Sequence, residues 1–230
     1  MFQFENRARV LAGVVAVLGA AGSAVAGVPA ADYTTIHSAL MSFNYSGVNG
    51  SVTESGNHTL FLTDPVSYVA PFGPESLNFG NAGSPGTGDA TWYLAGGYTD
   101  PDGAPLGDVL AGFVFFDPVF NVQSFAGLWT FDVEFQSAQG GVAITSLEPP
   151  FAIDGLSVSM TNALGEAVDL SVGTILANGR YSITASYQDF DFNGLPFNGF
   201  GFGMTVDAAV PAPGAIALLG LAGLAGRRRR

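Results

Sequence analysis

The stretch Leu128-Trp-Thr-Phe-Asp-Val-Glu-Phe135 decides the fold. From Trp129 onward, apolar and polar side chains alternate, which places the aromatic rings and Val133 on one side of an extended chain and Asp132 and Glu134 on the other. A period of two residues is typical of a strand with one face in a core and the other face in water. The stretch therefore predicts an amphipathic strand of an antiparallel sheet.

Other short runs around this stretch also have the composition of strands. Residues 180–187 and 199–206 alternate in the same way, whereas residues 109–116 are apolar throughout, as in a strand that is covered on both faces. Turn signals separate the runs, among them Asn49-Gly50, Ser55-Gly56-Asn57, Asp102-Gly103, Asn178-Gly179 and Asn193-Gly194.

Helical periodicity is weak between the two ends of the chain. No stretch within residues 27–210 keeps a period of 3.6 residues over three turns, and residues 35–41 could at most form a short helix. The glycine-rich residues 78–89 predict a loop. We therefore expect an all-β fold, a single antiparallel β-sandwich of jelly-roll-like connectivity, flanked by an N-terminal signal helix and a C-terminal hydrophobic helix.

The distribution of charge excludes one class of partner. The chain has 230 residues, with 19 acidic and seven basic side chains and a formal net charge of −12. Residues 27–210 hold 18 of the acidic residues and a single basic residue, Arg180, so this region carries a charge of −17. Such a surface repels nucleic acid. The chain has no cysteine, which excludes disulfides and thiolate metal sites.

The N-terminus has the three parts of a secretory signal peptide. Arg7 and Arg9 precede an apolar run over residues 10–22, and the small residues Ala24 and Ala26 then form a cleavage site. We expect signal peptidase to remove residues 1–26, after export by the secretion machinery. The exported domain would then comprise residues 27–209.

The C-terminal segment, residues 210–230, predicts a membrane anchor. Pro211 and Pro213 keep the chain extended before an apolar run over residues 214–226, and Arg227, Arg228, Arg229 and Arg230 end the chain. The apolar run is a short membrane span, and the arginines favour the cytoplasmic side. The exported domain would then lie outside the cytoplasm.

This tail resembles the PEP-CTERM sorting signal over its last 21 residues, with the motif residues Val210, Pro211, Ala212, Pro213 and Gly214. The family has a glutamate where this chain has Ala212. The resemblance implies that an exosortase, an intramembrane transpeptidase-like enzyme of Gram-negative bacteria with extracellular polysaccharide, recognises the motif and processes the tail.

Few residues suit catalysis. Asp132 and Glu134 share a strand face about 6.5–7 Å apart, which allows either a pair for glycoside cleavage or a solvated polar face, and we prefer the second interpretation. The two histidines, His37 and His58, lie far apart in the sequence, and His58 is expected in water at a turn that enters a strand. We therefore expect no enzyme activity.

A calcium site is one interpretation of Asp189-Phe-Asp-Phe-Asn-Gly194. Asp189, Asp191 and Asn193 supply oxygens at alternate positions before a glycine, as in a calcium loop, but the twelfth position is Phe200, where such a loop has glutamate. The alternative is an acidic strand that ends in an Asn-Gly turn. No other cofactor is expected.

Two functions remain open, and calcium-stabilised adhesion is a third. The first is a non-enzymatic protein of the cell surface or extracellular matrix, anchored by its C-terminal helix before an exosortase processes it. The second is a jelly roll that binds or cleaves surface polysaccharide, for which Trp92, Tyr93 and Trp129 could stack on sugars unless they pack in the core.

Overall fold

The structure is a computed structural model, and it describes residues 29–70, 73–80, 87–99, 105–117, 119–148, 155–188 and 199–209. The predicted signal helix and C-terminal helix lie outside these ranges. The strands within them are β1 (Thr34–Asn49), β2 (Val52–Leu62), β3 (Leu77–Phe79), β4 (Gly88–Thr99), β5 (Pro105–Phe116), β6 (Phe120–Phe135), β7 (Gly141–Glu148), β8 (Leu156–Asn162), β9 (Ala167–Val168), β10 (Ile175–Ala177), β11 (Gly179–Tyr187) and β12 (Gly199–Ala208).

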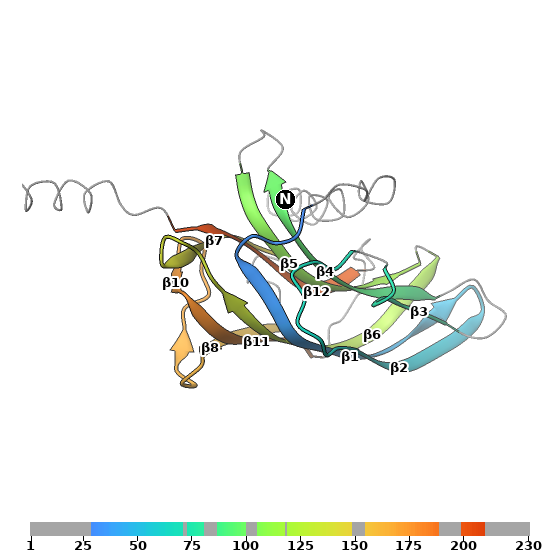
Figure 1. Ribbon diagram of the computed structural model, residues 1–230. Coiled ribbons are helices and arrows are strands. Elements are labelled where there is room, and N and C mark those ends of the chain that lie inside the picture. Colours follow the sequence, from blue (N-terminus) through green and yellow to red (C-terminus); the bar gives the residue numbers. More distant parts are fainter. Residues whose placement is uncertain are drawn as a thin grey trace, which may run out of the picture.

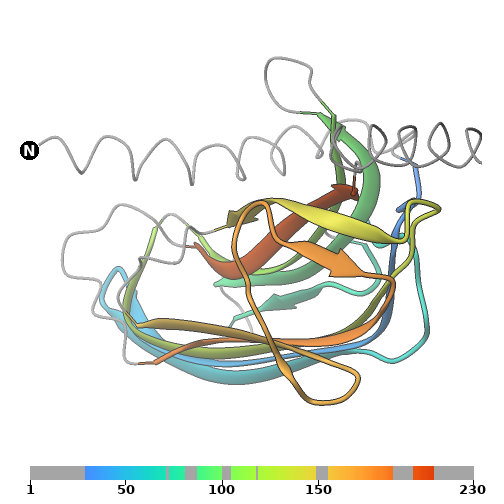
Figure 2. The same cartoon turned by 90° about the vertical axis from the view of Figure 1, so that its left-hand side faces the viewer.

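These strands form two antiparallel sheets of six strands each. Sheet A has the order β2-β1-β6-β11-β8-β9, and sheet B has the order β10-β7-β12-β5-β4-β3. The two sheets pack face to face as two layers, with sheet A below sheet B in Figures 1 and 2. The prediction of an all-β antiparallel sandwich is confirmed. The part of the chain that the structure describes contains no helix that could span a membrane.

The connectivity from β5 to β12 follows a regular scheme. The chain changes sheet at each step from β5 to β8, forms the β8–β9 hairpin within sheet A, and then changes sheet at each step to β12. As a result β5 pairs with β12, β6 with β11, and β7 with β10. The β1–β2 hairpin extends sheet A beyond β6, and β3 and β4 extend sheet B beyond β5.

The two strands with the clearest sequence patterns fold as expected. On β6, Trp129, Phe131 and Val133 are buried between the sheets, while Asp132 and Glu134 face outward. On β5, side chains on both faces are buried, as the uninterrupted apolar run predicted. Periodicity therefore distinguished the half-solvated strand from the one covered on both sides.

The short helix considered for residues 35–41 is wrong, because these residues belong to β1. A register shift between Ile36 and Ser38, where β1 pairs with β6, interrupts the two-residue alternation. The buried residues Ile36, Ala39 and Met41 therefore follow a spacing of three and then two, so the two-residue period of the strand is hidden at its start. The predicted loop at residues 78–89 is also only partly right, because β3 occupies its first residues and β4 its last.

The turn predicted at Ser55-Gly56-Asn57 is wrong as well, because these residues lie inside β2. Gly56 pairs with Tyr45 of β1, and a Cβ at this position would lie 2.7 Å from the Tyr45 ring. The glycine therefore leaves room for a core ring and does not mark a change of direction.

The centre of the sandwich holds both tryptophans. Trp92 of β4 and Trp129 of β6 are fully buried, and both approach Gly112 of β5. A Cβ at Gly112 would lie 2.7 Å from the Trp92 ring and 2.9 Å from the Trp129 ring. A buried hydrogen bond also joins the layers, since the Tyr187 hydroxyl donates to the carbonyl oxygen of Gly201 at 3.0 Å.

Candidate functional site

Most of the sites predicted from the sequence lie outside the described residues. These are the cleavage site, the sorting motif, the terminal arginines and the calcium candidates, namely Ala24, Ala26, Val210 to Gly214, Arg227 to Arg230, Asp189, Asp191 and Asn193. They remain predictions. Among the residues that are described, no group of three or more His, Cys, Asp or Glu side chains could hold a metal ion.

A charged group of four residues lies on the outer face of sheet A. It consists of His37 on β1, Asp132 and Glu134 on β6, and Arg180 on β11. His37 Nε2 lies 2.9 Å from Glu134 Oε2, and Arg180 Nε donates to Asp132 Oδ1 at 2.6 Å. A second guanidinium nitrogen of Arg180 donates to Asp132 Oδ2, so this pair is bidentate. Each carboxylate on this strand therefore has a basic partner from a neighbouring strand.

The electrostatics of this charged group do not suit acid catalysis. The hydrogen bonds from Arg180 hold the pKa of Asp132 below its ordinary value, and they raise the pKa of Arg180 in turn. A general acid for glycoside cleavage needs a raised pKa and a partner across a cleft. Asp132 has the opposite shift, and both carboxylates project side by side from one strand. The arrangement fits cross-strand ion pairs on a solvated face.

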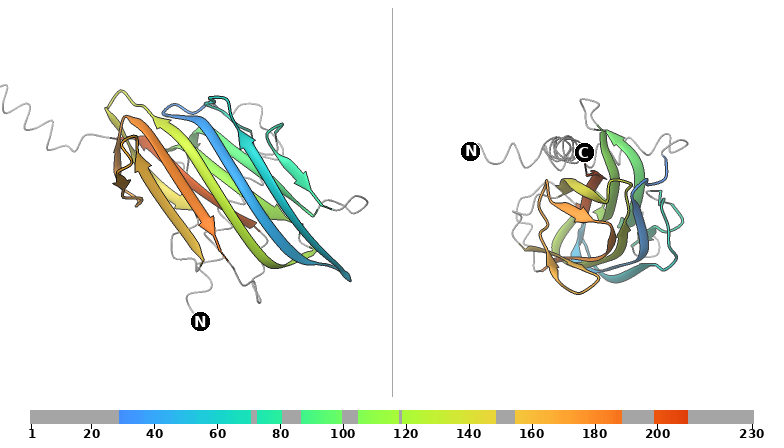
Figure 3. Two further views of the ribbon diagram at one scale, coloured as in Figure 1. Left: turned by 90° about the horizontal axis from the view of Figure 1, so that it is seen from below. Right: turned by 60° about the vertical axis from the view of Figure 1, so that its left-hand side comes forward.

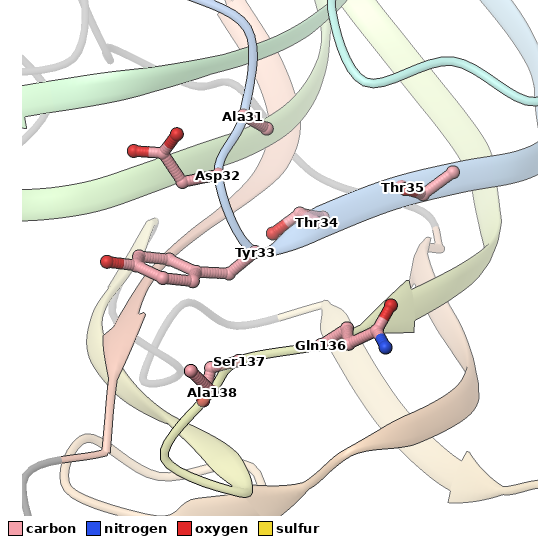
Figure 4. A pocket seen from close by; sticks show the side chains of 8 residues that line it. All are labelled: Ala31, Asp32, Tyr33, Thr34, Thr35, Gln136, Ser137 and Ala138. Atoms are coloured by element: carbon pink, nitrogen blue, oxygen red, sulfur yellow. The ribbon is translucent and has the colours of Figure 1, made fainter.

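A hollow of about 390 Å³ lies between the start of β1 and the chain that follows β6. Figure 4 shows its lining, which is mostly polar and comes from residues 31–35 and 136–138. The backbone N–H of Gln136 donates to the carbonyl oxygen of Tyr33 at 2.8 Å and ties the two sides together. The hydroxyl and amide groups of the lining could hold a small polar molecule by hydrogen bonds.

A buried carboxylate fixes one side of this hollow. Asp108 of β5 is only 1% exposed, and it accepts the backbone N–H groups of Asp32 at 2.8 Å and of Tyr33 at 2.7 Å. Burial raises the pKa of Asp108 above its ordinary value, while the two amide hydrogen bonds oppose that rise. Asp108 thus holds the segment before β1 against sheet B.

A second buried carboxylate joins the edges of the two sheets. Glu54 of β2 is 3% exposed, and Thr87, just before β4, donates its hydroxyl to Glu54 Oε2 at 2.6 Å. This hydrogen bond joins β2 of sheet A to the residue that precedes β4 of sheet B. Sequence reasoning missed both Glu54 and Asp108. The one local signal for each was a single acidic residue within a run of strand-forming residues.

The expectation that His58 lies in water at a turn is only partly right, because its side chain is half-buried. It lies within β2, and its ring centroid is 5.0 Å from that of Phe79 and 5.4 Å from that of Phe43. Burial lowers the pKa of His58 below its ordinary value. The imidazole therefore serves as part of the aromatic packing between the edges of the two sheets.

The aromatic residues considered for sugar stacking are not accessible. Trp92 and Trp129 are 0% exposed, and Tyr93 is 2% exposed. A stacking platform has to present its ring to the ligand. These three residues therefore belong to the packing, and a sugar-binding surface would need other side chains.

Comparison with known proteins does not assign the chain to a family. No family model, no curated protein and no solved structure matches the chain.

Proposed function

We propose that this protein is an exported component of the cell surface or extracellular matrix, without catalytic activity, whose C-terminal tail is a sorting signal. The single observation that carries the proposal is the order of features in residues 210–230, where Pro211-Ala212-Pro213 precedes a short apolar run and Arg227 to Arg230. Signal peptidase and an exosortase-type membrane enzyme are its processing partners. The apolar run holds the chain in the membrane before processing.

The position of the tail supports this proposal. The last strand of the described residues, β12, ends at Ala208, and the sorting segment begins at Val210. β12 pairs with both β5 and β7 in sheet B, so the chain leaves the sandwich from a strand with neighbours on both sides. A processing enzyme at the membrane would thus meet its motif directly after a folded unit.

The proposal includes a finer description of the fold. We assign the strands β5 to β12 to a jelly roll, in which the first strand pairs with the last and the pairing proceeds inward to a central hairpin. The pairs β5–β12, β6–β11, β7–β10 and β8–β9 support this assignment. In such a fold β1 to β4 are additions to the edges.

The test is to follow the protein in fractions of the producing cells. We expect the wild-type chain at the cell surface or in the matrix. A chain that lacks residues 210–230 should instead appear in the periplasm or the medium. Pro213→Ala should accumulate in the membrane, because the motif is lost while the anchor remains. If the truncated chain and Pro213→Ala both reach the same place as the wild type, the tail is not a sorting signal.

Ala212 allows a matched gain-of-function control. Ala212→Glu restores the acidic residue of the family motif, and we expect it to be processed at least as completely as the wild type. Ala215→Glu places the same charge inside the apolar run and should impair membrane insertion. Equal processing of both variants would contradict a role of the apolar run in presenting the motif to the membrane enzyme.

A further inference from the structure

The outer face of sheet A carries two rows of uncharged side chains that cross five strands. The first row runs through Thr59 of β2, Ser42 of β1, Leu128 of β6, Ser186 of β11 and Ser157 of β8. The second row runs in the same strand order through Phe61, Leu40, Thr130, Thr184 and Ser159. We call these two rows the hydroxyl face. Figure 3 shows the five strands side by side from this side.

The spacing of a β-sheet makes the hydroxyl face a regular array. Neighbouring strands lie about 4.8 Å apart, and residues on one face of a strand recur about every 6.8 Å. Each row therefore extends about 19 Å across the sheet. Serine and threonine hydroxyls both donate and accept hydrogen bonds, so the array can pair with a ligand that offers both kinds of group.

An apolar strip adjoins the hydroxyls at one end of the array. Phe61 is 62% exposed and lies opposite Leu40, while Leu128 lies opposite Ser42 on the next strand and is also exposed. An exposed ring of this kind can stack on the C–H face of a sugar.

The charges of the chain restrict the partner. The five strands contribute four charged or ionisable side chains to the outer face, His37, Asp132, Glu134 and Arg180, and these are paired with one another at one end. The hydroxyl face itself is uncharged, although residues 27–210 carry a charge of −17. A second copy of the chain and any anionic polymer would be repelled by this charge. An uncharged polymer would not be repelled by this charge.

We propose that the hydroxyl face binds an extended, uncharged polysaccharide. Sugar C–H faces lie on Phe61, Leu40 and Leu128, and sugar hydroxyls exchange hydrogen bonds with the adjoining serine and threonine side chains. The small side chains lose little rotamer freedom on binding. The inference rests on the proposed function only for access to such a polymer outside the cell, and not for the binding itself.

Affinity electrophoresis of the full chain, purified in a mild detergent, tests the proposal. Native gels contain one polymer each: hydroxyethylcellulose, laminarin, dextran or mannan as uncharged polymers, and alginate as an anionic one. We expect at least one uncharged polymer to retard the protein, and alginate to leave its mobility unchanged. No retardation by any uncharged polymer, or equal retardation by alginate, would overturn the proposal.

Two variants locate the binding surface. Ser186→Glu places a charge within the hydroxyl face, and Phe61→Ser removes the exposed ring. Each variant should need at least a tenfold higher polymer concentration to show the same retardation as the wild type. Ser67→Glu, an exposed position outside sheet A, is the matched control and should bind as the wild type does. The melting temperature of each variant is measured first, and binding is compared only among variants that melt at the wild-type temperature. Unchanged binding by both Ser186→Glu and Phe61→Ser would contradict this location, whatever happens at the tail.

Discussion

The outer faces of the two sheets differ in how far their side chains are exposed to water. On sheet A the outward side chains are mostly serine, threonine and asparagine, and the Phe61 ring lies exposed among them. On sheet B the outward side chains Tyr93, Ala95, Ala111 and Phe113 are buried and form a second apolar cluster. One sheet thus meets solvent with a polar surface, while the other carries a buried apolar cluster on part of its outer face. A partner that arrives from water can be recognised by the first face, whereas the second contributes to stability.

Two outward phenylalanines offer the sharpest test of this difference. Phe113 on sheet B is 8% exposed, and Phe61 on sheet A is 62% exposed. We expect Phe113→Ala to lower the free energy of unfolding by about 3 kcal/mol, because it removes a buried ring. Phe61→Ala should change it by about 0.5 kcal/mol or less. Urea denaturation measures both values, and similar losses would mean that the two faces do not differ.

Two aspartates provide the next comparison. Asp108 on sheet B is buried and accepts two backbone N–H groups, whereas Asp132 on sheet A is partly exposed and pairs with Arg180. Asp108→Ala should cost about 2–4 kcal/mol of unfolding free energy, because two amides lose their acceptor. Asp132→Ala should cost much less, since exposed ion pairs contribute little.

Chemical denaturation of both aspartate variants measures these losses of unfolding free energy. The slope of the unfolding transition should stay that of the wild type if the fold is unchanged. An Asp132→Ala variant that loses more stability than Asp108→Ala would contradict the roles assigned to these carboxylates.

A smaller effect is expected from His58 as the pH falls. Because burial lowers its pKa from the ordinary value of 6.5, the folded chain binds a proton at His58 less readily than the unfolded chain does. Stability should therefore decrease as the pH falls through 6.5 toward the lower folded value. His58→Gln should flatten this part of the profile. His37→Gln, on the outer face, is the control, and thermal melting from neutral to mildly acidic pH measures both.

The smallest effect concerns Asp132. Arg180 holds its pKa below the ordinary value of 3.8, so its contribution to stability is complete above that value and is lost as the pH falls through the lower folded pKa. The difference in melting temperature between the wild type and Asp132→Asn should be constant above roughly pH 5 and vanish at strongly acidic pH. A difference that grows toward low pH would have the wrong sign for this ion pair.

The sequence was informative where neighbours along the chain determine the pattern. The alternation in β6 and the apolar run in β5 predicted which faces are buried, since each depends on successive side chains pointing to opposite sides. β1 was missed in part, because the register shift near Ile36 breaks that alternation. Gly56 indicated a turn, yet it makes room for Tyr45 from the neighbouring strand.

The candidate sites depended more on contacts between distant residues. Asp108 and the Asp32 amide are 76 positions apart, and no local pattern indicates that they meet. The hydroxyl face was not foreseen for a similar reason. β2, β8 and β11 have serines and threonines at alternate positions, but only the register of five strands aligns them in rows with the residues of β1 and β6. The carboxylates Asp132 and Glu134 were placed on one face by their spacing, while their basic partners come from other strands.

The intact mass of the protein isolated from its producing cells tests the central claim most directly. A chain that begins at Gly27 and lacks the residues after the Pro211–Pro213 motif would agree with export followed by processing of the tail, and an additional attached mass would identify the acceptor chemistry. A chain that begins at Gly27 and still carries Arg227 to Arg230 would contradict it, because the tail would then be an anchor that no enzyme processes.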